Sequence, residues 1–134
     1  MKIYTDGAAR GNPGPAASAF LFVSASKIIH QEVEFIGNET NNTAEYIAII
    51  NALKTAQKFH AGHIQLFSDS KLAIQQIAKK WKINYPHLLK LAKKVLALVE
   101  KYDKVEFFHI KRENPYIQKC DQLCNERLDA ETKR

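Results

Sequence analysis

The chain has 134 residues, of which 46% are apolar and 25% are charged, so it can bury one substantial core but is too short for two ordinary domains. The formal net charge of +6 favours an anionic partner such as nucleic acid. No apolar run approaches the roughly 20 residues that span a bilayer, and we therefore expect one domain over residues 1–134 without a membrane segment.

The first predicted element is a short strand that ends in a carboxylate. Residues 2–5 are rich in strand-favouring types, and Asp6 follows them. Three glycines and two prolines in residues 7–15 then predict a loop without regular structure. An aspartate at a strand end can hold a divalent metal ion, and glycines let backbone N–H groups approach an anion. This stretch alone favours the simpler alternative, a tight turn with Asp6 as a local cap.

A hairpin and a long helix are predicted next. Side chains alternate between two faces over 17–24, and a more polar second arm over 28–36 is expected near a sheet edge. A helix is predicted over about 43–60, with Glu45 on its apolar stripe one turn before Ile49. Burial of an unpaired carboxylate is costly, so Glu45 needs an arginine or a metal ion, unless it is an ordinary glutamate that faces solvent.

A second strand and helix repeat the arrangement at Asp6. Residues 63–68 predict a strand that runs into Asp69, and Asp69 is a suitable cap for the helix that follows. Two strands that each end in aspartate, with a core-facing glutamate between them in the sequence, favour a shared site over coincidence.

The segment 79–94 is basic, with apolar and aromatic residues between its lysines. Pro86 is expected to open a helix with a buried apolar face, which explains part of the pattern as ordinary amphipathicity. Trp81 is either a partly buried anchor for this connection or a contact with a nucleotide strand, and the sequence does not decide between them.

The chain is predicted to finish with a strand over 105–110, a polar loop and a helix over 115–129. Cys120 and Cys124 lie on the inner side of that helix, where their spacing disfavours a disulfide. They are interpreted as small core residues in a reducing compartment, which predicts a cytoplasmic protein. Asp121 lies at the flank of the same side, so a fourth carboxylate points inward.

Four carboxylates would converge if the strands that carry Asp6 and Asp69 were neighbours and Glu45 and Asp121 entered from helices. The order of elements favours a mixed sheet with helices packed on it, because connections through helices give parallel pairs and hairpins give antiparallel pairs. Such a cluster needs cations to offset its repulsion, and ligands that are all oxygen favour Mg²⁺ or Mn²⁺ over zinc.

The chain resembles a type 1 ribonuclease H in its compact prokaryotic form. The matching stretches are Tyr-Thr-Asp-Gly with Gly-Asn-Pro-Gly-Pro in 4–15, Thr-Asn-Asn-Thr-Ala-Glu in 40–45, Ser-Asp-Ser in 68–70, and Asn-Pro through Cys-Asp-Gln-Leu-Cys-Asn in 114–125. The resemblance implies an α/β fold, with a five-stranded mixed sheet flanked by helices. It also implies endonucleolytic hydrolysis of the RNA strand of an RNA/DNA hybrid, by a monomer without the family's separate hybrid-binding domain.

The resemblance assigns the four catalytic and metal-binding carboxylates to Asp6, Glu45, Asp69 and Asp121, with two Mg²⁺ ions that Mn²⁺ can replace. In that assignment Asp6 bridges the ions, Asp121 helps to hold the ion that activates water, and the other two hold the ion beside the leaving 3′-oxygen. The implied substrate contacts are Gly11, Asn12, Asn41 and Asn42 in the minor groove and Thr40 and Asn84 at a DNA-strand phosphate, to which the basic segment adds Trp81.

The loop before the last helix departs from the family, because it lacks the histidine that many members carry there. Glu113 is the candidate replacement, and slower turnover is expected. Two rival interpretations stay open. One is a nucleic-acid-binding module on the same fold, which does not need four carboxylates. The other is a transposase-like or resolvase-like DNA nuclease, which a chimeric strand with a few ribonucleotides would distinguish.

Overall fold

The computed structural model describes residues 1–79 and 82–132, so Trp81 lies outside the described residues. The elements are β1 (Lys2–Ala9), β2 (Gly14–Ser24), β3 (Lys27–Glu39), α1 (Asn41–Ala56) with a 3-10 turn (Gln57–Phe59), β4 (His63–Ser68), α2 (Lys71–Ile77), α3 (Pro86–Val99), β5 (Lys104–His109) and α4 (Pro115–Thr132).

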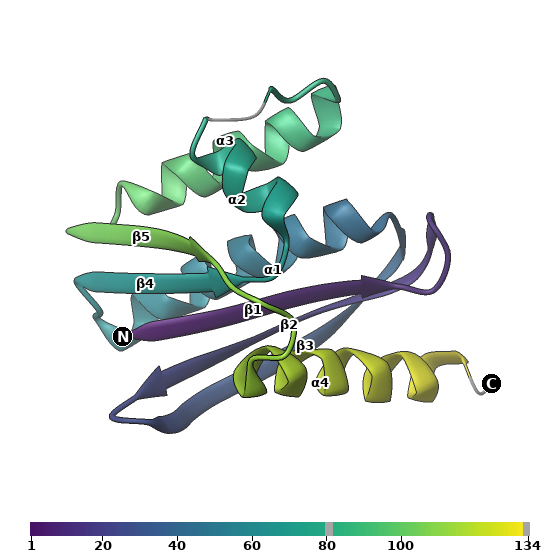
Figure 1. Ribbon diagram of the computed structural model, residues 1–134, viewed down its shortest axis with the longest axis horizontal. Helices are drawn as coiled ribbons and strands as arrows, with labels where there is room; N and C mark the ends of the chain where they lie inside the picture. Colours follow the sequence, from purple (N-terminus) through teal and green to yellow (C-terminus); the bar gives the residue numbers. More distant parts are fainter. Residues whose placement is uncertain (80–81, 133–134) are drawn as a thin grey trace.

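The strands form one mixed sheet in the order β3-β2-β1-β4-β5 (Figure 1). β2 pairs antiparallel with both β1 and β3, and β4 pairs parallel with both β1 and β5. Hairpins therefore build one half of the sheet, and connections through helices build the other. This confirms the predicted five-stranded mixed sheet and places the polar second arm, β3, at its edge.

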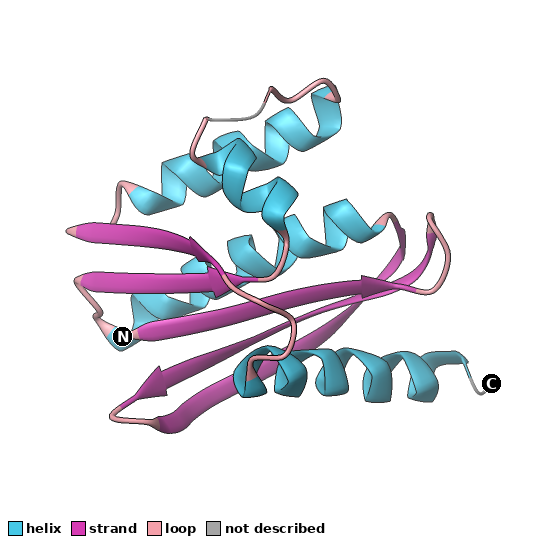
Figure 2. Cartoon of the chain, viewed as in Figure 1, coloured by secondary structure: helices cyan, strands magenta, loops and turns pink. Residues whose placement is uncertain are grey.

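Helices lie on both faces of the sheet (Figure 2). One apolar cluster, which includes Phe22, Tyr46 and Leu53, fills the space between the sheet and α1 to α3. The other, which includes Leu21 and Ile117, lies under α4, and α4 packs against β1, β2 and β3. No helix in the described part of the chain is both long and apolar enough to cross a membrane.

Strand β1 continues through Asp6, which corrects the prediction that the strand ends there and an irregular loop follows. Residues 7–9 stay paired with residues 16–18 of β2. On its other side β1 has already lost its partner, because the last parallel pair with β4 joins Thr5 to Ser68. Asp6 is therefore held in extended backbone by β2 at the point where β4 ends.

Strand β3 is also longer than the predicted arm over 28–36, because it continues through Gly37 and ends at Glu39. Gly37 has a φ of 83°, and the register of β2 against β3 shifts at this point. A bulge thus carries the strand across the glycine. The extension leads directly to Thr40, whose hydroxyl accepts a hydrogen bond from the Thr43 N–H and caps α1.

Helix α4 carries the two cysteines into the core, as predicted. Cys120 and Cys124 are both buried and free. The Cys124 thiol lies 3.9 Å from the main-chain oxygen of Asp6 and 3.6 Å from that of Ala17. Burial raises the pKa of both thiols well above the usual range, so they remain neutral packing groups.

Candidate active site

Three carboxylates from three elements meet where β4 ends. Asp6 comes from β1, Glu45 from the start of α1, and Asp69 from the residue after β4. One carboxylate oxygen of each lies within 4.8 Å of those of the other two. We call these three residues the acidic cluster. The structure therefore brings together three side chains that are far apart in the sequence. Even the nearest two, Glu45 and Asp69, are separated by 24 positions.

The cluster forms because α1 approaches β1 very closely. A Cβ atom at Gly7 would overlap the backbone of Ala44 and Glu45, so only glycine permits this distance. The Gly7 N–H donates a hydrogen bond to Glu45 Oε1. The Ser18 hydroxyl donates to the main-chain oxygen of Ala44 at 2.7 Å and fastens the start of the helix to β2.

Local capping does not account for these carboxylates. Helix α2 is capped by Ser70, whose hydroxyl accepts a hydrogen bond from the N–H three residues on, so the interpretation of Asp69 as the cap is wrong. The turn after β1 is closed by the Arg10 N–H, which donates to the main-chain oxygen of Pro15 at 2.8 Å, and Asp6 lies outside it.

Burial and mutual repulsion oppose ionisation in the acidic cluster. Asp6 and Glu45 are each only 5% exposed. Burial, helped by the charges of Asp69 and Asp121, raises the pKa of Asp6 to about 8. Burial also raises the pKa of Glu45 well above its usual range, and the charges of Asp6 and Asp69 raise it further. The ionised cluster is therefore costly unless a cation lies beside it.

The cluster has the properties of a site for a divalent cation. Asp69 Oδ1 is buried and has no hydrogen-bond partner among the described residues. A buried carboxylate oxygen without a donor is costly, and a cation would supply the missing partner. Because the ligand atoms are all carboxylate oxygens, the residues fit Mg²⁺ or Mn²⁺ better than zinc.

We expect the stability of the metal-free protein to fall as the pH rises from about 4 to about 8. The unfolded chain loses its carboxyl protons near pH 4, whereas the folded protein keeps the Asp6 proton up to about 8. The folded state binds more protons across this window, so raising the pH favours unfolding. Urea denaturation in a chelator at several pH values measures how steeply the free energy of unfolding falls with pH. This dependence should be shallower in Asp6→Asn than in the unmodified protein. An equal dependence in both proteins would contradict the raised pKa of Asp6.

Asp121 lies at the edge of the acidic cluster. It is not one of the three residues whose oxygens lie within 4.8 Å of one another. Its charge nevertheless helps to raise the pKa of Asp6. Asp121 is half-buried on α4, and its Oδ2 accepts a hydrogen bond of 3.2 Å from Asn125 Nδ2. The structure thus places the fourth predicted carboxylate beside the other three.

Candidate substrate residues gather at the start of α1. The Asn41 N–H donates to Asn12 Oδ1 at 3.1 Å, which joins the loop after β1 to the first residue of the helix. Gly11, Asn12, Asn41 and Asn42 are all exposed. These residues form one polar surface beside the acidic cluster, because Glu45 lies one turn further along α1.

A cavity of about 370 Å³ adjoins this polar surface, between the starts of α1 and α3. Thr40 and Asn42 line it from the side of α1, and Tyr85 and His87 line it from the side of α3. Asn84 is exposed and does not line the cavity, whereas Tyr85, the next residue, and His87 do.

Arg112 is a charged residue beside the cluster that was not among the candidates. Its Nε lies 3.9 Å from Asp69 Oδ2, while the arginine side chain is 79% exposed. Arg112 lies in the loop after β5, and β5 runs parallel to β4, so the loop begins next to the residue that follows β4. Glu113, the candidate replacement for the missing histidine, is exposed in the same loop.

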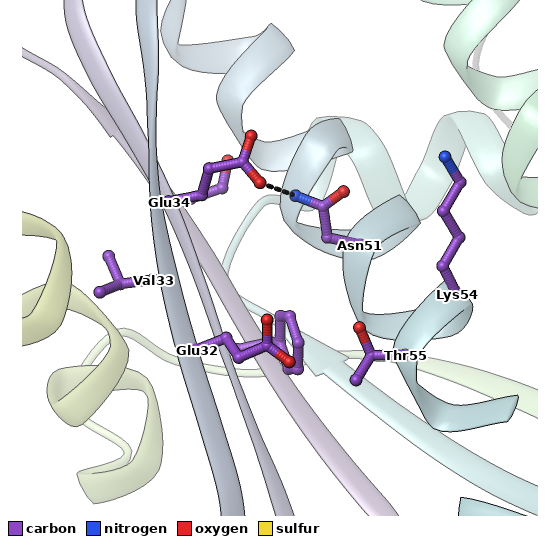
Figure 3. A pocket seen from close by; sticks show the side chains of 8 residues that line it. Glu32, Val33, Glu34, Asn51, Lys54 and Thr55 are labelled. Atoms are coloured by element: carbon purple, nitrogen blue, oxygen red, sulfur yellow. Dashed lines mark hydrogen bonds between the residues drawn. The ribbon is translucent and has the colours of Figure 1, made fainter. Parts of the chain in front are cut away.

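A second polar cavity, of about 160 Å³, lies between β3 and α1 (Figure 3). Glu34 and Asn51 point toward each other across it, and Asn51 Nδ2 donates to Glu34 Oε2 at 3.3 Å. Glu32 pairs with His30 at 2.6 Å. The carboxylates of Glu32 and Glu34 are exposed, and each has a partner in the protein. This cavity therefore lacks a buried carboxylate oxygen without a hydrogen-bond partner, such as the one at the acidic cluster.

Comparisons with known proteins find a family model that matches most of the chain and relatives that are named ribonuclease H or HI. A family model described as reverse transcriptase-like matches residues 4–126. The chain is 39% identical over 127 residues to a protein named ribonuclease HI from Halobacterium salinarum, covering 94% of this chain and 63% of that protein. It is 35% identical over 143 residues to a protein named ribonuclease H from Ehrlichia ruminantium, covering 94% and 92% of the two chains. The chain spans only 35% of the length of the bifunctional protein Rv2228c from Mycobacterium tuberculosis, to which it is 36% identical over 131 residues.

Solved structures extend this similarity to the whole fold. RNase H1 from Halobacterium salinarum matches with a TM-score of 0.92 and 38% identity, over 96% of this chain and 97% of that one. LC11-RNase H1, determined in complex with an RNA/DNA hybrid, matches with a TM-score of 0.90 and 33% identity over 97% of both chains.

Proposed function

The chain belongs to the ribonuclease H family, and on that premise we propose that it is an endonuclease that hydrolyses the RNA strand of an RNA/DNA hybrid. One observation carries the proposal: carboxylates from β1, α1 and the end of β4 place oxygens within 4.8 Å of one another. A relative that the chain covers over 92% of its length is named ribonuclease H, and one similar structure holds an RNA/DNA hybrid.

Asp6, Glu45, Asp69 and Asp121 are the proposed holders of two Mg²⁺ ions, which Mn²⁺ can replace. Two such ions supply positive charge that stabilises the attacking and leaving oxygens of an in-line displacement. The charge of Asp121 acts on Asp6 but is not among those that raise the pKa of Glu45. Asp6 is thus the buried carboxylate that responds to both Asp69 and Asp121, which supports the proposal that it would contribute to holding both ions.

The reaction adds the oxygen of a water molecule to the phosphorus and breaks the bond from phosphorus to the 3′-oxygen. The attacking water gives up one proton to solvent, and the leaving 3′-oxygen takes up one proton from solvent, so the products are a 5′-phosphate and a 3′-hydroxyl. The four carboxylates take no covalent part. Their role would be to hold the cations whose charge stabilises the reacting oxygens, and most of the rate enhancement would come from this positioning.

Substrate choice is proposed to depend on the polar surface at the start of α1. The 2′-hydroxyl distinguishes RNA from DNA and is accessible across the minor groove. The exposed amides of Asn12, Asn41 and Asn42, with the backbone at Gly11, can donate to and accept from such hydroxyls. The cavity beside Thr40 is the proposed place for a phosphate of the DNA strand, with Tyr85 and His87 on its far side.

We propose that residues 1–134 act as one catalytic domain and as a cytoplasmic monomer. Both apolar clusters lie against the same sheet, which supports a single folding unit. The buried, free cysteines on α4 are compatible with a reducing compartment.

The direct test uses end-labelled RNA/DNA hybrid, duplex DNA, duplex RNA and a chimeric strand with a few ribonucleotides, with and without Mg²⁺ or Mn²⁺. We expect metal-dependent cleavage of the hybrid, confined to RNA positions, and no cleavage by Asp6→Asn. Cleavage of duplex DNA would favour the DNA-nuclease alternative. Hybrid binding without cleavage in either metal would favour the binding module.

Arg112→Met is expected to lower kcat about tenfold with little change in stability. The guanidinium is largely exposed and lies beside Asp69, where it can reach a phosphate oxygen and stabilise its developing charge. Steady-state kinetics at saturating Mg²⁺ measure the effect, and Glu113→Gln is measured beside it because Glu113 is the other candidate in the same loop. A loss in Glu113→Gln with none in Arg112→Met would assign the role to the glutamate instead.

A further inference from the structure

A chain of hydrogen bonds reaches Asp121 from outside the acidic cluster. Asn125, one turn further along α4, donates from Nδ2 to Asp121 Oδ2 at 3.2 Å and to the Asp121 main-chain oxygen at 3.0 Å. Arg10 Nη2 donates to the Asn125 main-chain oxygen at 3.2 Å and to its Oδ1 at 3.5 Å. Arg10 also pairs with Asp129 at 2.6 Å. These contacts join the chain just after β1 to α4, across 115 positions of sequence.

The chemistry of the three side chains gives these hydrogen bonds one direction. A guanidinium only donates, an ionised carboxylate only accepts, and an amide does both. The Asn125 carbonyl must therefore face Arg10, and its NH₂ group must face Asp121. A residue with only donors or only acceptors at position 125 would satisfy one neighbour and lose the other.

Asp121 is the predicted ligand that the fold constrains least. Asp6 and Glu45 are buried, and Asp69 is only 15% exposed, so packing limits their side-chain conformations. Asp121 lies half-buried at the flank of a helix, where a free side chain would visit several rotamers. Groups that hold metal ions are commonly kept in place by hydrogen bonds from a second layer of residues.

Arg10 also stands at the start of the polar loop after β1. Its N–H closes that loop on Pro15 at 2.8 Å. Two residues later, Asn12 accepts a hydrogen bond from the Asn41 N–H. The same residue therefore anchors the loop with its backbone and Asn125 with its side chain.

We propose that Arg10 and Asn125 are positioning residues that hold the Asp121 carboxylate at the edge of the acidic cluster and tie it to the loop that contacts the RNA strand. This assignment rests on the proposed function, because it gives Asp121 a metal ion to hold. The pair Arg10 and Asp129 is exposed, and such pairs add little to stability. Loss of Arg10 or Asn125 is therefore expected to change metal binding more than folding.

The test compares Asn125→Leu and Arg10→Met with Arg127→Met. The last variant removes another exposed ion pair of α4, Arg127 with Glu131 at 3.1 Å, and serves as the control. Mn²⁺ is titrated by calorimetry into each protein bound to a hybrid with non-hydrolysable linkages, and urea denaturation is measured in parallel. We expect about tenfold weaker Mn²⁺ binding in Asn125→Leu, a smaller loss in Arg10→Met and none in Arg127→Met.

Cleavage kinetics should show the same effect as Mn²⁺ binding. We expect Asn125→Leu to need a higher Mg²⁺ concentration for half-maximal cleavage, with kcat at saturating Mg²⁺ close to that of the unmodified protein. Unchanged Mn²⁺ binding in Asn125→Leu overturns the proposal. A larger loss of stability in Asn125→Leu than in Arg127→Met also overturns it, because weaker binding would then follow from general loosening of α4. If the unmodified protein neither binds Mn²⁺ nor cleaves hybrid, the proposed function itself fails.

Discussion

Asp6→Asn is expected to reduce hybrid cleavage by about a thousandfold or more while making the metal-free protein more stable. Asparagine has the same shape as aspartate, so the packing of β1 is kept and only the charge is lost. Asp6 is one of the three carboxylates whose oxygens lie within 4.8 Å of one another, and the charges of both Asp69 and Asp121 raise its pKa. A loss of about 4 kcal/mol of transition-state stabilisation corresponds to this factor in kcat.

The gain in stability has the same cause as the loss of activity. At pH 7 the unfolded chain ionises Asp6 freely, whereas the folded protein holds it in a buried, repulsive setting that raises its pKa to about 8. Removing the carboxylate should add about 1 kcal/mol or more to the free energy of unfolding in a chelator, or a few degrees in Tm. Added Mg²⁺ should then stabilise the unmodified protein but not the variant.

Glu34→Gln is the matched control for Asp6→Asn, because it makes the same chemical change at an exposed position on β3. It should leave both cleavage and the effect of Mg²⁺ on Tm unchanged. If Asp6→Asn destabilised the metal-free protein, or if it retained more than a tenth of the activity, Asp6 would not be the shared ligand of the site.

Gly7→Ala is expected to lower the free energy of unfolding by about 3 kcal/mol or more. The added Cβ would overlap the backbone of Ala44 and Glu45, and backbone cannot turn aside as a flexible side chain can. Helix α1 would have to move away from β1, which would break the Gly7 hydrogen bond to Glu45 and separate Glu45 from the other carboxylates. Urea denaturation and hybrid cleavage should therefore both show a severe loss.

Gly37→Ala distinguishes close approach from the general cost of replacing a glycine. Gly37 has a φ of 83°, so alanine is strained there, but nothing lies within 4 Å of its added Cβ. The expected cost is about 1 kcal/mol, with cleavage retained. Similar losses at Gly7 and Gly37 would show that contact between β1 and α1 is not what Gly7 provides.

Local patterns in the sequence were enough to predict the helices. The apolar spacing after Thr40 predicted a helix at 43–60, close to the observed 41–56 with its short 3-10 turn. Pro86 opens α3 as expected, because a fixed φ and a missing N–H suit the first helical position. These features depend on neighbours within one or two turns, which the sequence displays directly.

Strand β1 shows where such local rules stop. Glycines and prolines after Asp6 predicted a loop, yet pairing with residues 16–18 keeps the backbone extended to Ala9. The energy of that pairing comes from a second strand and from the core beneath it, and neither is visible in the composition of residues 7–15. A register between strands is a property of two segments, so the propensity of one segment cannot supply it.

Residue types and their order were sufficient to identify the family and to nominate the four carboxylates, since each carboxylate lies in one of the four stretches that resemble the family. Folding alone settled that Asp6, Glu45 and Asp69 meet within 4.8 Å, that Asp121 stands at their edge, and that Arg112 lies beside Asp69. Contacts such as Arg10 with Asn125 have no periodicity or spacing that a sequence could reveal. They exist because sheet order and helix packing bring distant segments within hydrogen-bonding distance.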